Sequence, residues 1–273
     1  MRKTRRFVIG GAILVSALGV PNASAGESTC FGKEATIVGT QRSETLRGTS
    51  DNDVIVGKDG QDRIYGLGGN DRICGNGFYL SEEDTHGSDF LYGGPGADKI
   101  DGGIGDDGSY GGPGDDLIIA NGGTNGGSGF YAGDGMRGGR GDDELIGSRL
   151  GDTFYPGPGR DSMSGRRSFK GDDVVYYGEA NGPVVVDLKE KRASGEGRDL
   201  IFDVEIVYGS AFADKIFGTF EDNVFAGGPG NDVLGGRGGR DSLNGWGGYD
   251  RVNGGARHDF CYNAERRRNC EGP

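Results

Sequence analysis

Apolar residues recur every nine positions along most of this 273-residue chain, with glycine and aspartate between them. A helix would need apolar residues every three or four positions, so this longer period predicts short strands separated by tight turns. The predicted inward-facing stripe consists of Ile55, Ile64, Ile73, Leu91, Ile100, Ile118, Met136, Leu145, Phe154, Met163, Ile216, Phe225, Leu234, Leu243 and Val252. With strands of about three residues, one face of a solenoid coil uses about nine residues and a full coil about eighteen.

Each apolar residue is the eighth of a nonapeptide, G-G-x-G-x-D-x-U-x, in which U is apolar. The clearest copies begin at Gly93, Gly111, Gly138 and Gly227, and the copy that begins at Gly102 has Ser109 at the apolar place. Loose Gly-Asp pairs arise by chance, whereas a fixed frame does not. The sixth places keep a fixed frame within each of two blocks, with Asp53, Asp62, Asp71, Asp89, Asp98, Asp107, Asp116, Asp134, Asp143, Asp152 and Asp161 in the first and Asp214, Asn223, Asp232, Asp241, Asp250 and Asp259 in the second.

These nonapeptides resemble the hemolysin-type, or RTX, calcium-binding repeats over most of the segment from residue 36 to residue 260. The resemblance implies an all-β fold, a right-handed parallel β-roll or β-helix solenoid. It also implies that glycine carbonyls and the sixth-place Asp of one turn, with the equivalent loop of the next, surround multiple Ca²⁺ ions. The expected ligands are Asp53, Asp62, Asp71, Asp89, Asp98, Asp107, Asp116, Asp143, Asp161, Asp214, Asp232, Asp241 and Asp250, with Gly94, Gly96, Gly103, Gly105, Gly112, Gly114, Gly139, Gly141, Gly228 and Gly230.

The residue types in these turns suit calcium, which takes six to eight hard oxygens in forgiving geometry. Glycine can turn its carbonyl inward at φ values that other residues avoid, and the short Asp side chain reaches the same cavity. Alternate nonapeptides lie on opposite edges, so ligands of one ion are expected eighteen residues apart, as in the pairs Asp53–Asp71, Asp89–Asp107, Asp98–Asp116, Asp143–Asp161, Asp214–Asp232, Asp232–Asp250 and Asp241–Asp259.

Without metal, such rows would place like charges close together, so we expect the metal-free protein to be largely disordered. The alternative is a metal-free solenoid in which each Asp accepts hydrogen bonds from its own turn. That alternative explains Asp in turns but leaves the repeated G-x-D frame unexplained.

Composition agrees with bound cations. The chain has 60 glycines, 33% hydrophobic residues and a net charge of -12, with 42 acidic against 30 basic residues. A conventional core of this size cannot easily offset the entropy of ordering so much glycine. The acidic excess indicates cations as partners rather than nucleic acid.

Residues 1–25 are expected to be a cleaved signal peptide, with four basic residues, an apolar stretch from Phe7 to Val20 and the small residues Ala23 to Ala25. The apolar stretch is short for a membrane span, so we expect a secreted, extracellular protein without membrane insertion. General and twin-arginine export both stay open. Proteins of this type that leave by type I secretion carry a C-terminal signal instead.

Four cysteines in an exported chain favour two disulfides over free thiols or zinc. Of three possible pairings, we expect Cys30–Cys74 and Cys261–Cys270, one at each end of the array.

The predicted organisation has five parts. Residues 26–173, after the signal peptide (1–25), hold an N-terminal cap and the first β-roll block, 174–208 hold longer β-helix coils, 209–262 the second block, and 263–273 a disulfide-closed cap.

Phe78 to His86 is expected to protrude as an acidic loop, with a recognition or metal site there as an alternative. Residues 120–137 are expected to form one degenerate coil, and Asp199 is a candidate for one further ion. Arg266, Arg267 and Arg268 are expected to belong to a polar end cap.

The sequence carries no H-E-x-x-H, G-x-S-x-G or phosphate-loop motif and has two histidines, so no enzymatic activity is expected. The prediction is a secreted calcium-binding repeat protein that folds on binding Ca²⁺ and is structural or adhesive at the cell exterior. Ninth-place tyrosines such as Tyr92, Tyr110 and Tyr155 would suit an adhesive face. Alternatives are a calcium reservoir and a calcium-stabilised extracellular enzyme or accessory module acting on polysaccharide or protein. A cell-surface or polysaccharide partner is not identified by the sequence.

Overall fold

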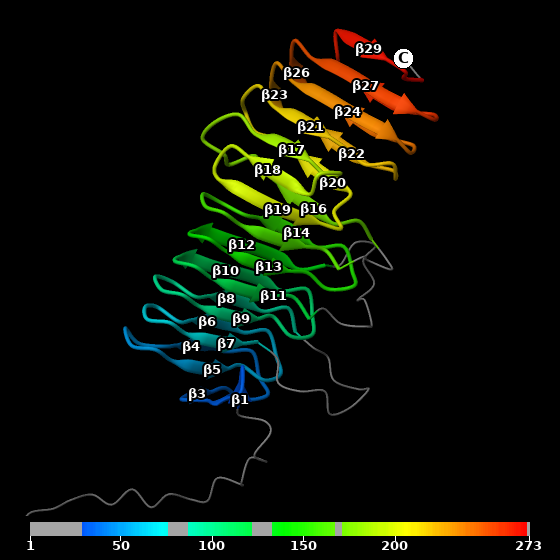
Figure 1. The fold of residues 1–273 in the computed structure, drawn as a ribbon. Coiled ribbons are helices and arrows are strands. Elements are labelled where there is room, and N and C mark those ends of the chain that lie inside the picture. The colour runs from blue at the N-terminus through cyan, green and yellow to red at the C-terminus, as the bar shows by residue number, and fades with distance from the viewer. Residues whose placement is uncertain (1–28, 76–86, 122–132, 167–170, 272–273) are drawn as a thin grey trace, which may run out of the picture.

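The computed structural model describes residues 29–75, 87–121, 133–166 and 171–271. The predicted signal peptide and the predicted loop from Phe78 to His86 lie outside the described residues. Within them the chain winds into a solenoid of short strands and has no helix, so none is long and apolar enough to cross a membrane (Figure 1). Stacked coils build two long, mainly parallel sheets, which confirms the expected all-β roll.

The first long sheet has 14 strands among the described residues. In spatial order they are β3 (Ile37–Val38), β5 (Val54–Val56), β7 (Arg72–Cys74), β9 (Lys99–Asp101), β11 (Leu117–Ile119), β13 (Glu144–Ile146), β15 (Ser162–Ser164), β19 (Arg198–Phe202), β18 (Arg192–Ser194), β17 (Val185–Asp187), β21 (Lys215–Phe217), β24 (Val233–Gly238), β27 (Arg251–Ala256) and β29 (Arg266–Arg268).

The second long sheet has 11 strands in the same part of the chain. They are β4 (Thr45–Arg47), β6 (Arg63–Tyr65), β8 (Phe90–Tyr92), β10 (Gly108–Pro113), β12 (Gly135–Arg140), β14 (Thr153–Tyr155), β16 (Val174–Tyr176), β20 (Ile206–Tyr208), β22 (Val224–Ala226), β25 (Ser242–Asn244) and β28 (Phe260–Tyr262). Two small sheets pair β1 (Thr29–Cys30) with β2 (Lys33–Glu34) and β23 (Pro229–Gly230) with β26 (Gly247–Gly248).

Strand register confirms the predicted coil length. Ile55 lies opposite Ile73, and Phe225 lies opposite Leu243, each an offset of one eighteen-residue coil. Register also shows an offset of one extra nonapeptide after β7, where Ile73 lies opposite Ile100. That offset agrees with a nine-residue insertion in this stretch.

Register shows the same longer offset across residues 120–137, which the sequence predicted to form one degenerate coil. Ile118 pairs directly with Leu145 and Ser109 with Met136. Residues 122–132 themselves lie outside the described residues.

The junction between the two blocks also differs from the expected longer coils. β16, β17 and β20 fall where strands were predicted, but β17, β18 and β19 form an antiparallel meander inside the 14-stranded sheet. A tight turn starts the meander: the Glu190 N–H donates to Asp187 at 3.1 Å, and Lys191 has a φ of 56°. The meander keeps the sheet continuous because β17 pairs with β21 of the second block.

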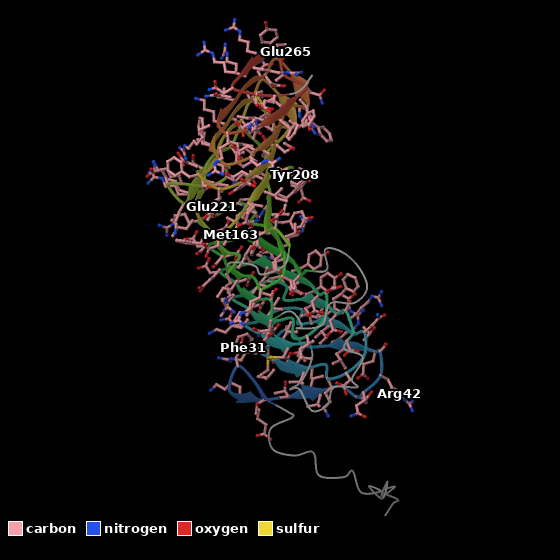
Figure 2. The ribbon with its side chains drawn as sticks, turned by 90° about the vertical axis from the view of Figure 1, so that its right-hand side faces the viewer. Phe31, Arg42, Met163, Tyr208, Glu221 and Glu265 are labelled. Carbon is pink, nitrogen blue, oxygen red and sulfur yellow. A yellow bond between two sulfur atoms is a disulfide. The ribbon has the colours of Figure 1, made fainter. Side chains whose placement is uncertain are left out.

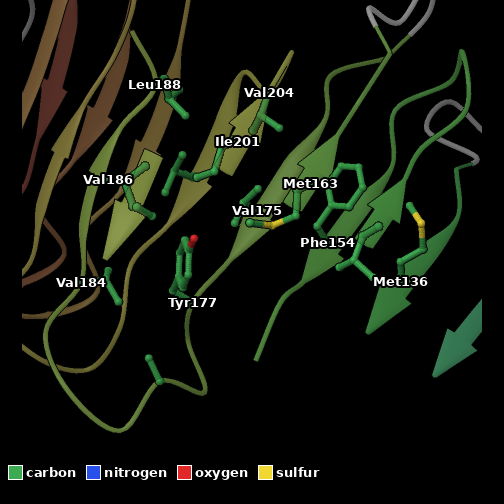
Figure 3. Close-up of a cluster of buried hydrophobic side chains, with 14 of the residues drawn as sticks. Met136, Phe154, Met163, Val175, Tyr177, Val184, Val186, Leu188, Ile201 and Val204 are labelled. Atoms are coloured by element: carbon green, nitrogen blue, oxygen red, sulfur yellow. The ribbon is translucent and has the colours of Figure 1, made fainter. Parts of the chain in front are cut away.

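The core is a narrow double column of eighth-place side chains, one from each sheet per coil. All residues of the predicted stripe are buried, and the meander adds Val186, Ala193 and Ile201. Figure 3 shows Val186 and Ile201 near the stripe residue Met163. Ser109 is buried at 3% exposure in the apolar column. Each large apolar side chain contributes on the order of 1.5 to 3 kcal/mol, but each coil supplies only two of them.

Both predicted disulfides are confirmed. Cys30–Cys74 ties β1 to β7, beside Phe31 in Figure 2, and Cys261–Cys270 ties β28 to the segment after β29. The terminal coils, which each lack one stacking neighbour, are therefore linked covalently.

Two neighbouring residues of β19 test how much the buried apolar column contributes to the free energy of unfolding. Ile201 is 2% exposed and Leu200 is 49% exposed. We expect Ile201→Ala to lower the free energy of unfolding by about 2 to 5 kcal/mol because it leaves a cavity. The control, Leu200→Ala, should cost only about 0.5 kcal/mol. Guanidinium unfolding in one buffer measures both, and equal losses would contradict the inward assignment.

Candidate metal sites

The sixth-place acids line both edges of the solenoid, where each turn enters a strand. Every acid that the sequence predicted as a ligand is buried, with Asp98 at 1% exposure as an example. Asp134, Asp152, Asp173, Asp199 and Asp259 share this burial. Carboxylates are seldom so enclosed unless a partner compensates their charge.

One carboxylate oxygen of each acid joins neighbouring coils. The Asp53 N–H donates to Asp71 Oδ1 at 2.8 Å, and this bond repeats from coil to coil. All of the predicted eighteen-residue pairs are such neighbours. Because of the extra nonapeptides, Asp62–Asp89, Asp71–Asp98, Asp107–Asp134 and Asp116–Asp143 are neighbours at a separation of 27 residues. The acids thus form ladders along both edges.

The second oxygen has a different environment in most of these acids. Oδ2 is buried and accepts no hydrogen bond from the described part of the chain in Asp62, Asp71, Asp89, Asp98, Asp107, Asp116, Asp143, Asp161, Asp232, Asp241, Asp250 and Asp259. Leaving a buried carboxylate oxygen without a partner costs several kcal/mol, on the order of the penalty for burying an uncompensated charge. These oxygens therefore require a cation or a proton.

Raised pKa values of these carboxyl groups indicate the same need for a cation or a proton. Burial, together with the neighbouring carboxylate of Asp134, raises the pKa of Asp107 to about 9. Burial likewise raises the pKa of Asp161 to about 8 and that of Asp89 to about 7. Carboxyl groups with such values resist ionisation near neutral pH as long as no positive charge is near.

In most turns the first place is a glycine, which leaves space beside the unpaired oxygen. A Cβ atom on Gly93 would lie 2.2 Å from Asp98 Oδ2 and 2.7 Å from the Gly111 carbonyl oxygen of the next coil. A Cβ on Gly111 would meet Asp116 Oδ2 and the Gly138 carbonyl at the same two distances. A carboxylate and a carbonyl oxygen thus face one small space, which suits a hard cation such as calcium.

The predicted glycine ligands occupy the second and fourth places, and all of them have positive φ. A Cβ on Gly112 would lie 2.4 Å from the Gly94 carbonyl oxygen, and one on Gly114 would lie 1.7 Å from that of Gly96. Their carbonyls therefore form rows between successive turns. The first-place carbonyls were not among the predicted ligands. Weaker copies of the repeat nevertheless retain glycine at the first place, as Gly57 before Lys58 and Gly66 before Leu67 show.

Side chains alone do not complete a metal site in the described part of the chain, where no three His, Cys, Asp or Glu residues converge. Since calcium takes six to eight oxygens, backbone carbonyls would have to supply the others. The repeat provides them in every glycine turn.

Three candidate acids have both oxygens engaged. Asp199 accepts the Asp161 N–H at 3.3 Å and the buried Tyr177 hydroxyl at 3.0 Å. Burial raises the pKa of Tyr177 well above its ordinary value, so this phenol keeps its proton and donates. Asp53 and Asp214 accept additional hydrogen bonds from Thr49 and Ser210. Their roles as ligands remain predictions.

A comparison with protein-family models finds the RTX calcium-binding nonapeptide repeat (4 copies), which matches residues 38–78, 85–108, 109–130, 204–234 and 227–261. No curated protein matches the chain. The matches cover more than half of the chain and include the ladder acids from Asp53 to Asp116 and from Asp214 to Asp259. Together with the parallel β-roll and its buried Asp ladders, they show that the chain belongs to the RTX calcium-binding nonapeptide repeat family.

Proposed function

We propose that this protein is secreted, folds around multiple Ca²⁺ ions and has a structural or adhesive role at the cell exterior. The observation that carries the proposal is the set of buried Asp Oδ2 atoms without a hydrogen-bond donor in the described residues. Calcium binding itself follows from the repeat family. Secretion, the number of ions, the coupling of binding to folding and the structural or adhesive role are the parts that we propose.

The chain's own groups would act as follows when calcium is bound. The Oδ2 atom of a sixth-place Asp and the first-place carbonyl of the next coil would hold the ion, which supplies positive charge between coils. Meanwhile Asp Oδ1 keeps the coils in register through the backbone N–H. Because two apolar side chains per coil bury little surface, calcium binding would contribute a large share of the folding free energy.

Two features support secretion. Disulfides persist mainly in oxidising compartments, and both cysteine pairs are bonded. The basic, apolar and small-residue segments of residues 1–25 follow the order of an export signal.

A half-buried aromatic row supports the adhesive role. Tyr65, Tyr92 and Tyr110 stack on the outer face of the 11-stranded sheet, with ring centroids 4.9 and 4.8 Å apart. Arg47 and Arg137 extend the row through cation–π contacts with Tyr65 and Tyr110. Tyrosine and arginine are the side chains that binding surfaces favour, because they combine apolar area with hydrogen-bonding groups.

A non-enzymatic role remains our proposal, supported by the lack of a motif for nucleophilic or metal-assisted catalysis in the sequence. The alternative of an accessory module acting on polysaccharide has one observation in its favour. A cavity of about 410 Å³ lies beside Tyr155 and Tyr176, with Arg137 and Glu179 paired at its wall. Aromatic rings and hydrogen-bonding side chains in one cavity suit a polar ligand with apolar faces.

Calcium titration tests the main proposal. Starting from protein freed of metal, we expect Ca²⁺ to convert a largely disordered circular dichroism spectrum into one rich in β-structure. Mg²⁺ at equal concentration should do so far less, because it demands strict octahedral geometry and retains water. A spectrum that stays unchanged on chelation would contradict the coupling of binding to folding.

The pH dependence of the stability of the fold should reverse when calcium is bound. A carboxyl whose folded-state pKa exceeds its ordinary value stabilises the fold below that ordinary value, and this stabilisation is lost as pH rises through the folded-state pKa. With the pKa of Asp161 at about 8 and that of Asp89 at about 7, metal-free protein should contain more β-structure near about pH 5 than near about pH 9.

In saturating calcium we expect the opposite trend, because protons compete with the ion for the same oxygens. Circular dichroism spectra of protein treated with chelating resin, recorded across this pH range with and without added Ca²⁺, measure both trends. A metal-free β-structure content that increases with pH would contradict the unpaired state of these carboxylates.

A further inference from the structure

Two kinds of turn carry the Asp ladders, and the second residue of the nonapeptide distinguishes them. In the glycine-type turns this residue has a left-handed backbone, with φ of 108° at Gly94 and 121° at Gly112. Even the non-glycine residues Lys58, Leu67, Arg237 and Trp246 adopt positive φ at this place. The other kind has Thr49, Ser148, Ser210 or Thr219 there, and φ is not positive at any of these four.

The backbone difference redirects the second-place N–H. In glycine-type turns it points to the next coil: the Gly94 N–H donates to the Gly111 carbonyl at 2.9 Å, and the Lys58 N–H donates to the Gly75 carbonyl at 2.9 Å. In the serine turn the Ser210 N–H donates to Oδ2 of Asp214, in the same turn, at 2.5 Å. The oxygen left unpaired in a glycine-type turn is thus occupied in a serine turn.

The hydroxyl completes the closure. Ser210 Oγ donates to Asp214 Oδ1 at 2.8 Å and accepts the Phe212 N–H at 3.1 Å. Thr49 closes its turn in a similar way, because both its N–H and its hydroxyl donate to Asp53 Oδ2, at 2.6 and 2.9 Å. Ser148 N–H donates to Asp152 Oδ2 at 2.5 Å. In each case protein groups satisfy the carboxylate that burial would otherwise leave without compensation.

The fourth such turn needs no carboxylate at all. Its sixth place is Asn223, whose Oδ1 accepts the Thr219 N–H at 2.8 Å and the Thr219 hydroxyl at 3.3 Å. A neutral amide here keeps the same closure without a charge. This is the arrangement expected if no cation binds beside it.

We propose that the turns at residues 48–53, 147–152, 209–214 and 218–223 hold no calcium through their own sixth-place residue and are closed by serine or threonine instead. The proposal rests on the calcium-binding function proposed above and specifies which turns carry it. It removes Asp53 and Asp214 from the expected ligands and leaves the glycine-type turns as the calcium turns. The turns at 209–214 and 218–223 make the first coil of the second block, so that coil can form before calcium binds.

Matched Asp→Asn variants of the purified, disulfide-bonded protein test the assignment. Bound calcium per chain is measured by equilibrium dialysis with metal analysis. We expect Asp143→Asn and Asp232→Asn each to lose at least one ion, because each removes an unpaired carboxylate. Asp152→Asn and Asp214→Asn should retain the ion count of the unaltered protein. If Asp152→Asn loses as many ions as Asp143→Asn, or Asp214→Asn as many as Asp232→Asn, the proposal is overturned.

A gain of binding gives an independent check. The double variant Ser210→Gly with Phe212→Gly converts residues 209–214 to the sequence of a glycine-type turn, and we expect it to bind one more ion than the unaltered protein. A folded double variant with an unchanged ion count would contradict the proposal. Absence of calcium binding in the unaltered protein would instead overturn the proposed function, so the two failures are distinguishable.

Discussion

The buried carboxylate of the sixth-place aspartate is the group on which the rest of this structure depends. Its Oδ1 atom accepts the backbone N–H of the neighbouring coil and so sets the register of both long sheets. Its Oδ2 atom is enclosed with no donor among the described groups in most coils. One side chain therefore both aligns the coils and creates the demand for a cation.

Glycine makes that arrangement geometrically possible. A side chain at the first place would occupy the space between Oδ2 and the carbonyl of the next coil, as the distances around Gly93 show. Positive φ at the second place sends its N–H to the next coil and away from the carboxylate. Where serine replaces glycine, the backbone changes its conformation and the same N–H binds the carboxylate. The chemistry of a turn thus follows from a single backbone angle.

Features outside the repeat hold the solenoid together where the ladder is interrupted. The meander of β17, β18 and β19 bridges the two blocks of the 14-stranded sheet, and Arg237 pairs with Asp187 at 2.7 Å across that junction. Arg237 also donates to the Gly218 carbonyl at 2.6 Å. The disulfides link the terminal coils, and the three arginines of β29 place charge on the last strand. Charged residues on an edge strand discourage pairing with further chains.

The sequence by itself determined the coil length, the inward-facing stripe and the acid pairs eighteen residues apart. These follow from a fixed frame, because each repeat packs against an equivalent repeat one coil away. The disulfide pairs were predicted separately, from the places of the cysteines at the two ends of the array. The tertiary structure alone decided the antiparallel meander, the direct pairing of Ser109 with Met136, and the contact of Tyr177 with Asp199. It also decided which carboxylates already have partners, because a sixth-place Asp looks identical in the frame whether Gly94 or Ser210 precedes it. The difference lies in the direction of one N–H, and only the folded backbone sets that direction.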